Sequence, residues 1–126
     1  MNRLAERIAD SELEVMRVLW DAQKALPVSE IREAICQKTG WEGSTAKTLL
    51  YRLKRKGVVA QEKRDVYYYS PCVTEDEYTE YTTQALIDKL YKSSAKNLIA
   101  SLVSSKKLSE KDISELQEMF RRGNKR

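Results

Sequence analysis

The amino-acid sequence predicts a mainly α-helical fold with one small β-hairpin. Apolar residues recur at the spacing of an α-helix in three short segments before residue 58. Two β-prone runs with a polar turn between them follow directly, and after Pro71 a long segment without glycine or proline carries a further apolar stripe. In 126 residues there is room for one small domain and an appended helical module, which we place at residues 1–72 and 73–126.

The first expected helix begins near Ser11. Ser11-Glu12-Leu13-Glu14 matches the capping box S-x-x-E, in which a hydroxyl and a carboxylate satisfy the free backbone N–H groups of a helix start. The residues that follow at helical spacing, and that we expect on the buried side, are Leu13, Met16, Leu19 and Trp20.

A second expected helix follows a break at Leu26-Pro27-Val28. Ser29 offers an N-cap hydroxyl, and the helix is expected to end near Thr39-Gly40, because glycine suits the left-handed residue after a helix. Its predicted buried side consists of Ile31, Ala34 and Ile35.

The third expected helix has an apolar back and a basic, hydroxyl-rich front. Ser44 is its predicted N-cap, and Gly57 is predicted to end it in the left-handed conformation. The residues spaced to pack against a core are Ala46, Leu49, Leu50 and Leu53. The residues left facing outward are Thr45, Lys47, Thr48, Tyr51 and Arg52.

A β-hairpin is predicted directly after the third helix. Val58–Glu62 and Val66–Ser70 are β-prone runs, and the polar turn Lys63-Arg64-Asp65 separates them. We expect most of the tyrosines in Tyr67-Tyr68-Tyr69 to belong to the core. Three short helices followed by a hairpin form a winged helix-turn-helix, in which the last helix reads DNA. The alternative is a three-helix packing core with no DNA role.

The charge distribution favours the DNA-binding alternative. Between Ser44 and Arg64 there are seven lysines and arginines and one acidic residue, so this segment carries +6 although the whole chain carries only +4. A concentrated basic face is typical of a module that contacts phosphates. We expect base edges or the adjoining backbone to be contacted by Ser44, Thr45, Lys47, Thr48 and Arg52, and phosphates to be clamped by Lys54, Lys56, Lys63 and Arg64.

The segment after Pro71 predicts a two-helix module. A capping pattern T-x-x-E begins at Thr74 and opens a long helix up to Leu108, and a third box at Ser109 opens a last helix, after which Arg121–Arg126 is expected to be frayed. Two amphipathic helices alone bury too small a core to be stable, so we expect them to pack against a second copy. The predicted dimerisation residues are Leu86, Ile87, Leu90, Tyr91, Leu98, Ile99, Leu102, Val103, Leu116 and Phe120.

The composition argues against an enzyme and against a membrane protein. The chain contains no histidine, the commonest general base and nitrogen metal ligand, and it has no phosphate loop or nucleophile elbow. Cys36 and Cys72 have no metal-ligand spacing around them, so we expect no metal and no cofactor. No apolar run approaches the roughly 20 residues that span a bilayer, and the first nine residues lack a signal-peptide core, so we expect a cytoplasmic protein without membrane insertion.

The sequence resembles the BlaI/MecI/CopY family, the penicillinase, methicillin-resistance and copper-operon repressors of bacteria. The resemblance covers nearly the whole chain and is most specific between Trp41 and Gly57, where Thr45, Lys47, Thr48, Arg52, Leu53, Lys56 and Gly57 are in register with the family pattern. The opening Ser11–Trp20, the strand ending Tyr-Tyr-Ser and the start of the last helix at Leu108-Ser109 are also similar.

The resemblance implies a homodimeric winged-helix repressor that binds an inverted-repeat operator in double-stranded DNA. In the penicillinase branch, a membrane sensor protease leads to cleavage within the dimerisation helices, commonly at an Asn-Phe bond, and Ser101-Leu102 occupies that position here. The copper branch carries a C-terminal cysteine motif, and this chain has no cysteine after Cys72.

Residues alone also leave open a protein of another class. A winged-helix interaction module could use the same basic face to bind an acidic protein partner. Within the regulator interpretation, an activator or a small-ligand sensor stays open as well.

Overall fold

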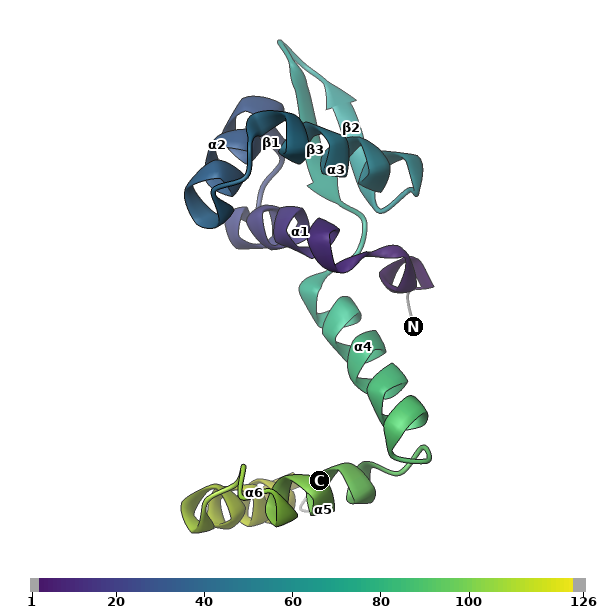
Figure 1. Cartoon of the computed structure of the whole chain (residues 1–126), viewed down its shortest axis with the longest axis vertical. Helices are drawn as coiled ribbons and strands as arrows, with labels where there is room; N and C mark the ends of the chain where they lie inside the picture. The colour runs from purple at the N-terminus through teal and green to yellow at the C-terminus, as the bar shows by residue number, and fades with distance from the viewer. Residues whose placement is uncertain (1–2, 124–126) are drawn as a thin grey trace. The chain divides into compact units, whose positions relative to one another are not determined.

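The structure is a computed structural model that describes residues 3–123 (Figure 1). Its elements in chain order are a 3-10 helix η1 (Arg3–Arg7), α1 (Asp10–Ala22), β1 (Leu26–Pro27), α2 (Val28–Thr39), α3 (Gly43–Arg55), β2 (Val59–Lys63), β3 (Tyr67–Pro71), α4 (Glu75–Leu90), α5 (Ala95–Ser104) and α6 (Glu110–Gly123). The predicted fold class, mainly helical with a small β-structure, is confirmed. Residues 1–2 and 124–126 of the two predicted domains lie outside the described residues.

The hydrophobic core of the N-terminal part lies between α1, α2, α3 and the strands. The predicted stripe of α3 is confirmed, since Ala46, Leu49, Leu50 and Leu53 are all buried. Met16 and Leu19 of α1 and Ile31 and Ile35 of α2 are buried against it, whereas Leu13, Trp20 and Ala34 are only partly buried. Because the apolar sides of α1, α2 and α3 pack into one core, that packing fixes the orientation of α3.

Three predicted N-caps are wrong, because each helix begins before the serine proposed for it. The N-cap residues are Ala9 for α1, Pro27 for α2 and Glu42 for α3, so Ser11, Ser29 and Ser44 lie inside the first turns. In α1 the Glu12 carboxylate still accepts from a free backbone N–H, but from that of Ala9, at 2.9 Å. The predicted helix ends are confirmed at Gly40 and Gly57, whose φ angles of 77° and 80° are left-handed.

The β-structure contains a strand that the sequence did not indicate. The strand order is β1-β3-β2, and both pairings are antiparallel. The additional strand is β1, which lies between α1 and α2 in the chain. Its Leu26 and Pro27 pair with Tyr69 and Tyr68 of β3. A strand of two residues is too short to show an alternation of polar and apolar residues, so only its pairing with β3 identifies it.

The prediction that most of the wing tyrosines belong to the core is wrong. Tyr69 packs against the core and is partly buried, but Tyr68 is half-buried outside the core cluster and Tyr67 is exposed. β3 projects beyond the helices, so the residues nearest the hairpin tip have no core to pack on (Figure 1).

The C-terminal segment contains three helices where two were predicted. The expected single helix from residue 75 to residue 108 is interrupted at residues 91–94, where Lys92 and Ser93 have positive φ angles of 52° and 60°. The Ser93 N–H donates to the Ile87 carbonyl at 3.1 Å and ends α4, and the Ser94 hydroxyl caps α5 by accepting from the Asn97 N–H at 3.2 Å. The turn thus forms without glycine or proline, the two residues that usually mark one.

The two predicted capping boxes of this segment are confirmed. The Glu77 N–H donates to the Thr74 hydroxyl and the Thr74 N–H donates to the Glu77 carboxylate, at 3.0 and 2.9 Å. Ser109 and Asp112 make the same reciprocal pair, with both bonds at 3.0 Å. α6 continues to Gly123, so the prediction of a frayed tail from Arg121 is wrong within the described residues.

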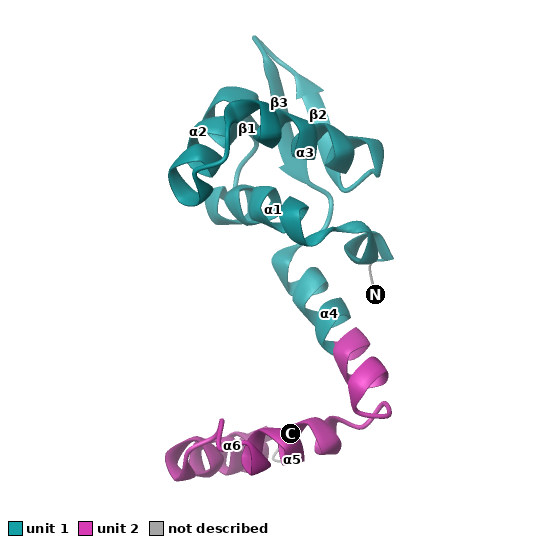
Figure 2. Ribbon diagram, viewed as in Figure 1, with its two compact units in different colours: residues 1–83 teal, residues 84–126 magenta. Residues whose placement is uncertain are grey.

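The chain divides into two compact units, residues 1–83 and 84–126 (Figure 2). This division falls inside α4, later than the predicted domain boundary after residue 72, because the first half of α4 packs on the N-terminal unit. The Trp20 indole N–H donates to the Val73 carbonyl at 2.8 Å, and the Trp20 and Tyr78 rings lie 5.7 Å apart. The Tyr81 hydroxyl also donates to the Glu6 carboxylate, at 2.9 Å.

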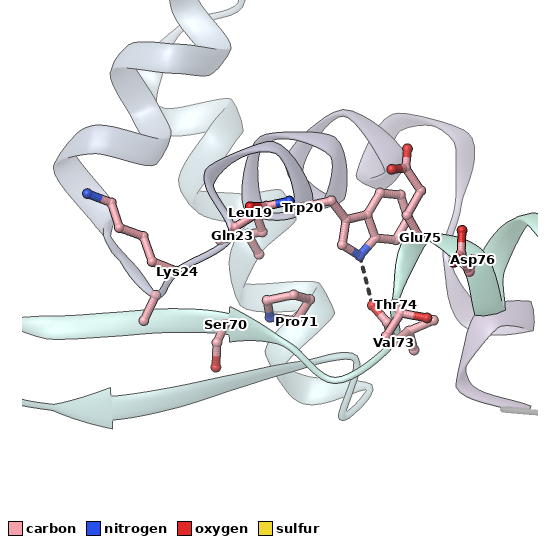
Figure 3. Close-up of a pocket in the computed structure, with 11 residues that line it drawn as sticks. Leu19, Trp20, Gln23, Lys24, Ser70, Pro71, Val73, Thr74, Glu75 and Asp76 are labelled. Carbon is pink, nitrogen blue, oxygen red and sulfur yellow. Dashed lines mark hydrogen bonds between the residues drawn. The ribbon is translucent and has the colours of Figure 1, made fainter.

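A pocket of about 540 Å³ lies within the first unit, at the junction of α1, β3 and the start of α4 (Figure 3). Trp20 and Val73 both form part of its wall, and the Trp20 indole N–H donates to the Val73 carbonyl there (Figure 3). Lys24, Glu75 and Asp76 are among its polar lining residues. Because these elements are distant in sequence, no local pattern indicated the pocket.

Candidate nucleic-acid interface

α3 presents a continuous row of hydroxyl and basic side chains on its outward side. Burial of its apolar stripe leaves Thr45, Lys47, Thr48 and Arg52 exposed, as predicted. Ser44 is also exposed, although it does not cap the helix. A groove of about 230 Å³ is lined by Ser44, Thr45, Thr48, Leu49 and Arg52. Ser44, Thr45, Thr48 and Arg52 therefore share one surface, and Lys47 lines a different groove.

The Thr48 hydroxyl is held in a fixed direction. It donates to the Ser44 carbonyl one turn earlier, at 3.0 Å. Its proton is occupied in this way, but its oxygen can still accept a hydrogen bond from a donor outside the protein. Thr45 has an exposed side chain on the same groove.

A second groove, of about 160 Å³, separates α3 from the strands. Lys47, Tyr51 and Lys54 line it from α3, and Gln61 and Tyr69 line it from β2 and β3. The Gln61 side-chain amide donates to the Tyr69 hydroxyl at 2.8 Å, which joins the two strands at the floor of the wing. The structure thus brings together Lys47, a predicted contact to base edges or the adjoining backbone, and Lys54, a predicted phosphate clamp.

The wing tip carries two further predicted cations, each placed over a tyrosine. Lys63 Nζ lies 4.7 Å from the centre of the Tyr67 ring, and the Arg64 guanidinium lies 4.4 Å from that of Tyr68. Such cation–π contacts are weak where water reaches the cation. The sequence analysis expected most of these tyrosines in the core. The missed signal was the pair of cations placed just before the tyrosine run, so that Lys63 pairs with Tyr67 across the hairpin.

Arg64 also bonds to Glu62 on the adjoining strand. Its Nε lies 3.1 Å from Glu62 Oε1, and this hydrogen bond is the main cause of a raised Arg64 pKa, opposed by slight desolvation. The guanidinium is fully charged in any case. An exposed pair of this kind contributes little to stability, so an approaching phosphate can compete for Arg64.

Tyr51 and Arg55 are exposed residues of α3 that the predicted site omitted. The Arg55 guanidinium lies 5.8 Å from the Tyr51 ring centre, one helical turn away. Aromatic and basic residues four positions apart on a helix face are neighbours, which is the signal that could have found the pair.

Lys56 does not join the other predicted phosphate clamps. Its Nζ donates to the Glu12 carboxylate at 2.6 Å and to the Arg7 carbonyl at 2.9 Å, and the Arg7 guanidinium donates back to the Lys56 carbonyl at 3.1 Å. Glu12 is only 1% exposed. The sequence analysis assigned no buried role to Glu12. Lys56 therefore neutralises a buried carboxylate and ties α3 to α1.

The predicted dimerisation residues form a largely exposed apolar surface in the second unit. Leu86, Leu90, Ile99, Val103, Leu116 and Phe120 are exposed, and Phe120 is 71% exposed. Tyr91, Leu98 and Leu102 are half-buried, and Ile87 alone of the predicted residues is buried within the chain itself. A groove of about 640 Å³ between α5 and α6 is lined chiefly by Ile99, Val103, Leu108, Ile113, Leu116 and Phe120.

The candidate cleavage bond lies in the C-terminal half of α5. Ser101 and Leu102 are both half-buried, and the Ser101 carbonyl accepts from the Ser105 N–H at 3.0 Å and from the Ser105 hydroxyl at 2.8 Å. The backbone at this bond is therefore helical and hydrogen-bonded.

Within residues 3–123, no helix combines the length and the apolar character needed to cross a membrane. In the same part of the chain, no three histidine, cysteine, aspartate or glutamate residues are grouped in a way that could hold a metal ion.

Comparison with known proteins identifies relatives along nearly the whole chain. Residues 8–122 match the family described as Penicillinase repressor. The penicillinase repressor of Bacillus licheniformis is 27% identical over 115 residues, which cover 90% of this chain and 89% of the relative.

Two solved structures match the N-terminal part. The DNA-binding domain of the repressor BlaI is 32% identical, with a TM-score of 0.53 over 62% of this chain and 94% of that domain. The Bacillus licheniformis BlaI monomer in complex with the blaP half-operator is 33% identical, with a TM-score of 0.50 over 56% of this chain and 87% of that one. These matches confirm the resemblance and the winged-helix prediction. The chain belongs to the penicillinase repressor family, and it is a DNA-binding repressor rather than an enzyme.

Proposed function

We propose that the chain is a homodimeric transcriptional repressor that binds an inverted-repeat operator, with one α3 in each half-site. The observation that carries the proposal is α3, whose buried apolar stripe leaves a row of hydroxyl and basic side chains exposed beside a wing with two cations at its tip. In helix-turn-helix proteins the corresponding helix lies in the major groove. The solved complex of a relative with a half-operator supports this placement.

The two grooves suggest a division of roles among the proposed contacts. Thr45, Lys47, Thr48 and Arg52 lie along the outward face of α3, where side chains can reach base edges or the adjoining backbone. Ser44 lies in the first turn, where a hydroxyl suits a phosphate. The phosphate clamps that we propose are Lys54, Lys63 and Arg64, and Lys56 is left out because Glu12 engages its amine.

Dimerisation is proposed from the exposed apolar surface of the second unit. Ile99, Val103, Leu116 and Phe120 belong to two neighbouring helices and are all exposed in a single copy. Removing apolar surface from water is favourable by roughly 25 cal/mol for each Å², so burying these residues against a second copy favours association. A two-fold arrangement would bury the same residues of both copies. A dimer gains affinity because the second half-site is bound at high effective concentration.

Proteolytic relief of repression is the second part of the proposal. A separate membrane sensor protease system would lead to cleavage between Ser101 and Leu102, which would detach α6 and the end of α5 from the DNA-binding unit. Because the Ser101 carbonyl is held by Ser105, α5 has to open locally before a protease can bind this bond in extended form. Such a dimer acts where the chromosome lies, in the cytoplasm.

A fluorescence-anisotropy titration tests the DNA-binding part. The full chain is titrated against a duplex from upstream of its own gene and against a scrambled duplex, at low and near-physiological salt. We expect preference for the first duplex, two protomers for each duplex, and a preference that survives the higher salt. Lys47→Ala should weaken binding to the preferred duplex by roughly 10-fold to 100-fold if Lys47 reads a base, about 1–3 kcal/mol.

The matched control is Lys24→Ala. Lys24 is an exposed cation that lines the pocket beside Trp20 and neither groove of α3, so its loss should leave binding unchanged. Equal, salt-labile binding to both duplexes would contradict the operator proposal and favour an acidic protein partner for the basic face.

A further inference from the structure

Arg32 of α2 lies against the first residue of α3. A Cβ atom added to Gly43 would lie 2.6 Å from Arg32 Nη2, 2.7 Å from Nε and 3.1 Å from Cζ. Side-chain carbons do not approach other atoms below about 3.0 Å without a shift. A Cβ at position 43 would therefore make the guanidinium move away, a cheap shift because it is the far end of a flexible, exposed side chain.

The backbone of Gly43 does not itself require glycine. The positive φ angles of glycines in the described chain belong to Gly40 and Gly57, and Gly43 is an ordinary helical residue. Glycine is a poor helix former, and alanine is the best. What glycine supplies at position 43 is room for the Arg32 side chain.

The Arg32 charge is available to a partner outside the chain. Arg32 is exposed, and within residues 3–123 no hydrogen bond or ion pair engages its guanidinium. By contrast, Arg7, Arg17, Lys38 and Lys56 of the same unit bond to groups of the protein. A guanidinium with five N–H donors suits the oxygens of a phosphate.

The position of Arg32 places it at the edge of the proposed interface. Gly43, against which it lies, is followed by Ser44 and Thr45, the first two residues of the row on α3. Arg32 itself is separated from the basic segment Ser44–Arg64 by the rest of α2, up to Thr39, and a loop, so the charge pattern of the sequence did not include it.

We propose that Arg32 is a further contact to the DNA backbone, next to Ser44 and Thr45, and that Gly43 is glycine so that the guanidinium can lie there. The inference rests on the proposed operator binding and adds a residue from α2 to that site. A phosphate contact carries no sequence preference of its own, so Arg32 should act on every duplex alike.

The test compares Arg32→Ala, Arg32→Lys and Gly43→Ala in the full chain, with Lys24→Ala as the control for loss of one positive charge. Each is titrated against the upstream duplex and the scrambled duplex at several salt concentrations, and its thermal unfolding is recorded. We expect Arg32→Ala to bind both duplexes roughly three- to tenfold more weakly and to lower the slope of log K against log salt by about 0.9. Arg32→Lys should recover most of the slope.

Gly43→Ala is the decisive variant, because it leaves every charge in place. It should melt at the wild-type temperature or above, since alanine favours the helix, and yet lose part of the DNA affinity that Arg32→Ala loses, because the guanidinium has to leave its place beside position 43. In a chain that already carries Arg32→Ala, it should have no further effect on binding.

Two outcomes separate this inference from the proposal beneath it. If the wild-type chain prefers the upstream duplex while Arg32→Ala and Gly43→Ala bind both duplexes as wild type does, the Arg32 contact is refuted and operator binding stands. If the wild-type chain shows no preference for the upstream duplex, operator binding is refuted, and a slope that Arg32→Ala lowers on both duplexes still supports Arg32 as a phosphate contact.

Discussion

Replacing Lys56 with methionine should destabilise the protein without removing a contact to DNA. Glu12 is 1% exposed, and its Oε1 accepts from Lys56 Nζ at 2.6 Å and from the Ala9 N–H at 2.9 Å. Without Lys56, the carboxylate keeps one neutral donor. Removing one partner of a buried ion pair costs about 3–5 kcal/mol. Because the Lys56 side chain is 36% exposed, water already screens the pair, and we expect about 2–3 kcal/mol here.

A double-mutant cycle separates the pair from its surroundings. Glu12→Gln should cost about 1–2 kcal/mol, because the amide oxygen can still accept from Ala9 and the freed Lys56 amine can reach water. The double variant Glu12→Gln/Lys56→Met leaves no charge buried, so its cost should fall short of the sum of the single costs by about 1 kcal/mol or more. Urea unfolding measures all four proteins, with Lys54→Met as an exposed control expected within about 0.5 kcal/mol of wild type.

Operator titrations of the same variants decide between the two roles considered for Lys56. The structure predicts that Lys56→Met keeps the wild-type dependence of DNA affinity on salt. A slope reduced by about 1, with unfolding unchanged, would show that Lys56 clamps a phosphate, as the sequence pattern suggested. Additive costs in the cycle would also refute the ion pair as the reason for the loss of stability.

Two further predictions concern the second unit. Phe120→Asp should place a charge in the exposed apolar surface and convert a dimer to a monomer in sedimentation equilibrium, with loss of operator affinity although no DNA contact has changed, and a proven monomer with full affinity would contradict the dimer proposal. Hydrogen bonds from Ser109, chiefly from its backbone N–H and then from its hydroxyl, hold the pKa of Asp112 below its ordinary value of 3.8. Because the pKa of Asp112 is lower in the folded chain, its ionised carboxylate stabilises the start of α6 at pH values above 3.8. This contribution is lost as the pH falls through the folded pKa. Ser109→Ala should therefore raise the Asp112 pKa in an NMR titration, and an unchanged pKa would count against the capping box.

The elements that sequence patterns predicted correctly are those with a strong short-range signal. The stripe of α3 and the capping boxes at Thr74 and Ser109 follow from spacing within a few residues, and all three are confirmed. The serine caps at positions 11, 29 and 44 failed because each N-cap lies two residues earlier, at a residue whose side chain makes no capping hydrogen bond. Choosing between neighbouring starts depends on packing as well as on the local pattern.

The candidate site shows the same limit. The exposed row on α3 was predictable because burial of one face of a helix exposes the other. Charge alone could not separate Lys54, which faces a groove, from Lys56, whose amine bonds to Glu12. The break between α4 and α5 was also hidden, because residues 91–94 contain neither glycine nor proline.

The sequence by itself determined the helical class, the buried side of α3 and much of that of α1 and α2, the hairpin, the basic segment and the family. These depend on periodicity, turn residues and composition, all of which are written over short stretches of chain. Only the tertiary structure decided that Lys56 neutralises Glu12, that β1 pairs with β3, and that Arg32 lies against Gly43. Each of these contacts joins residues of different elements, and their meeting depends on how those elements pack in three dimensions.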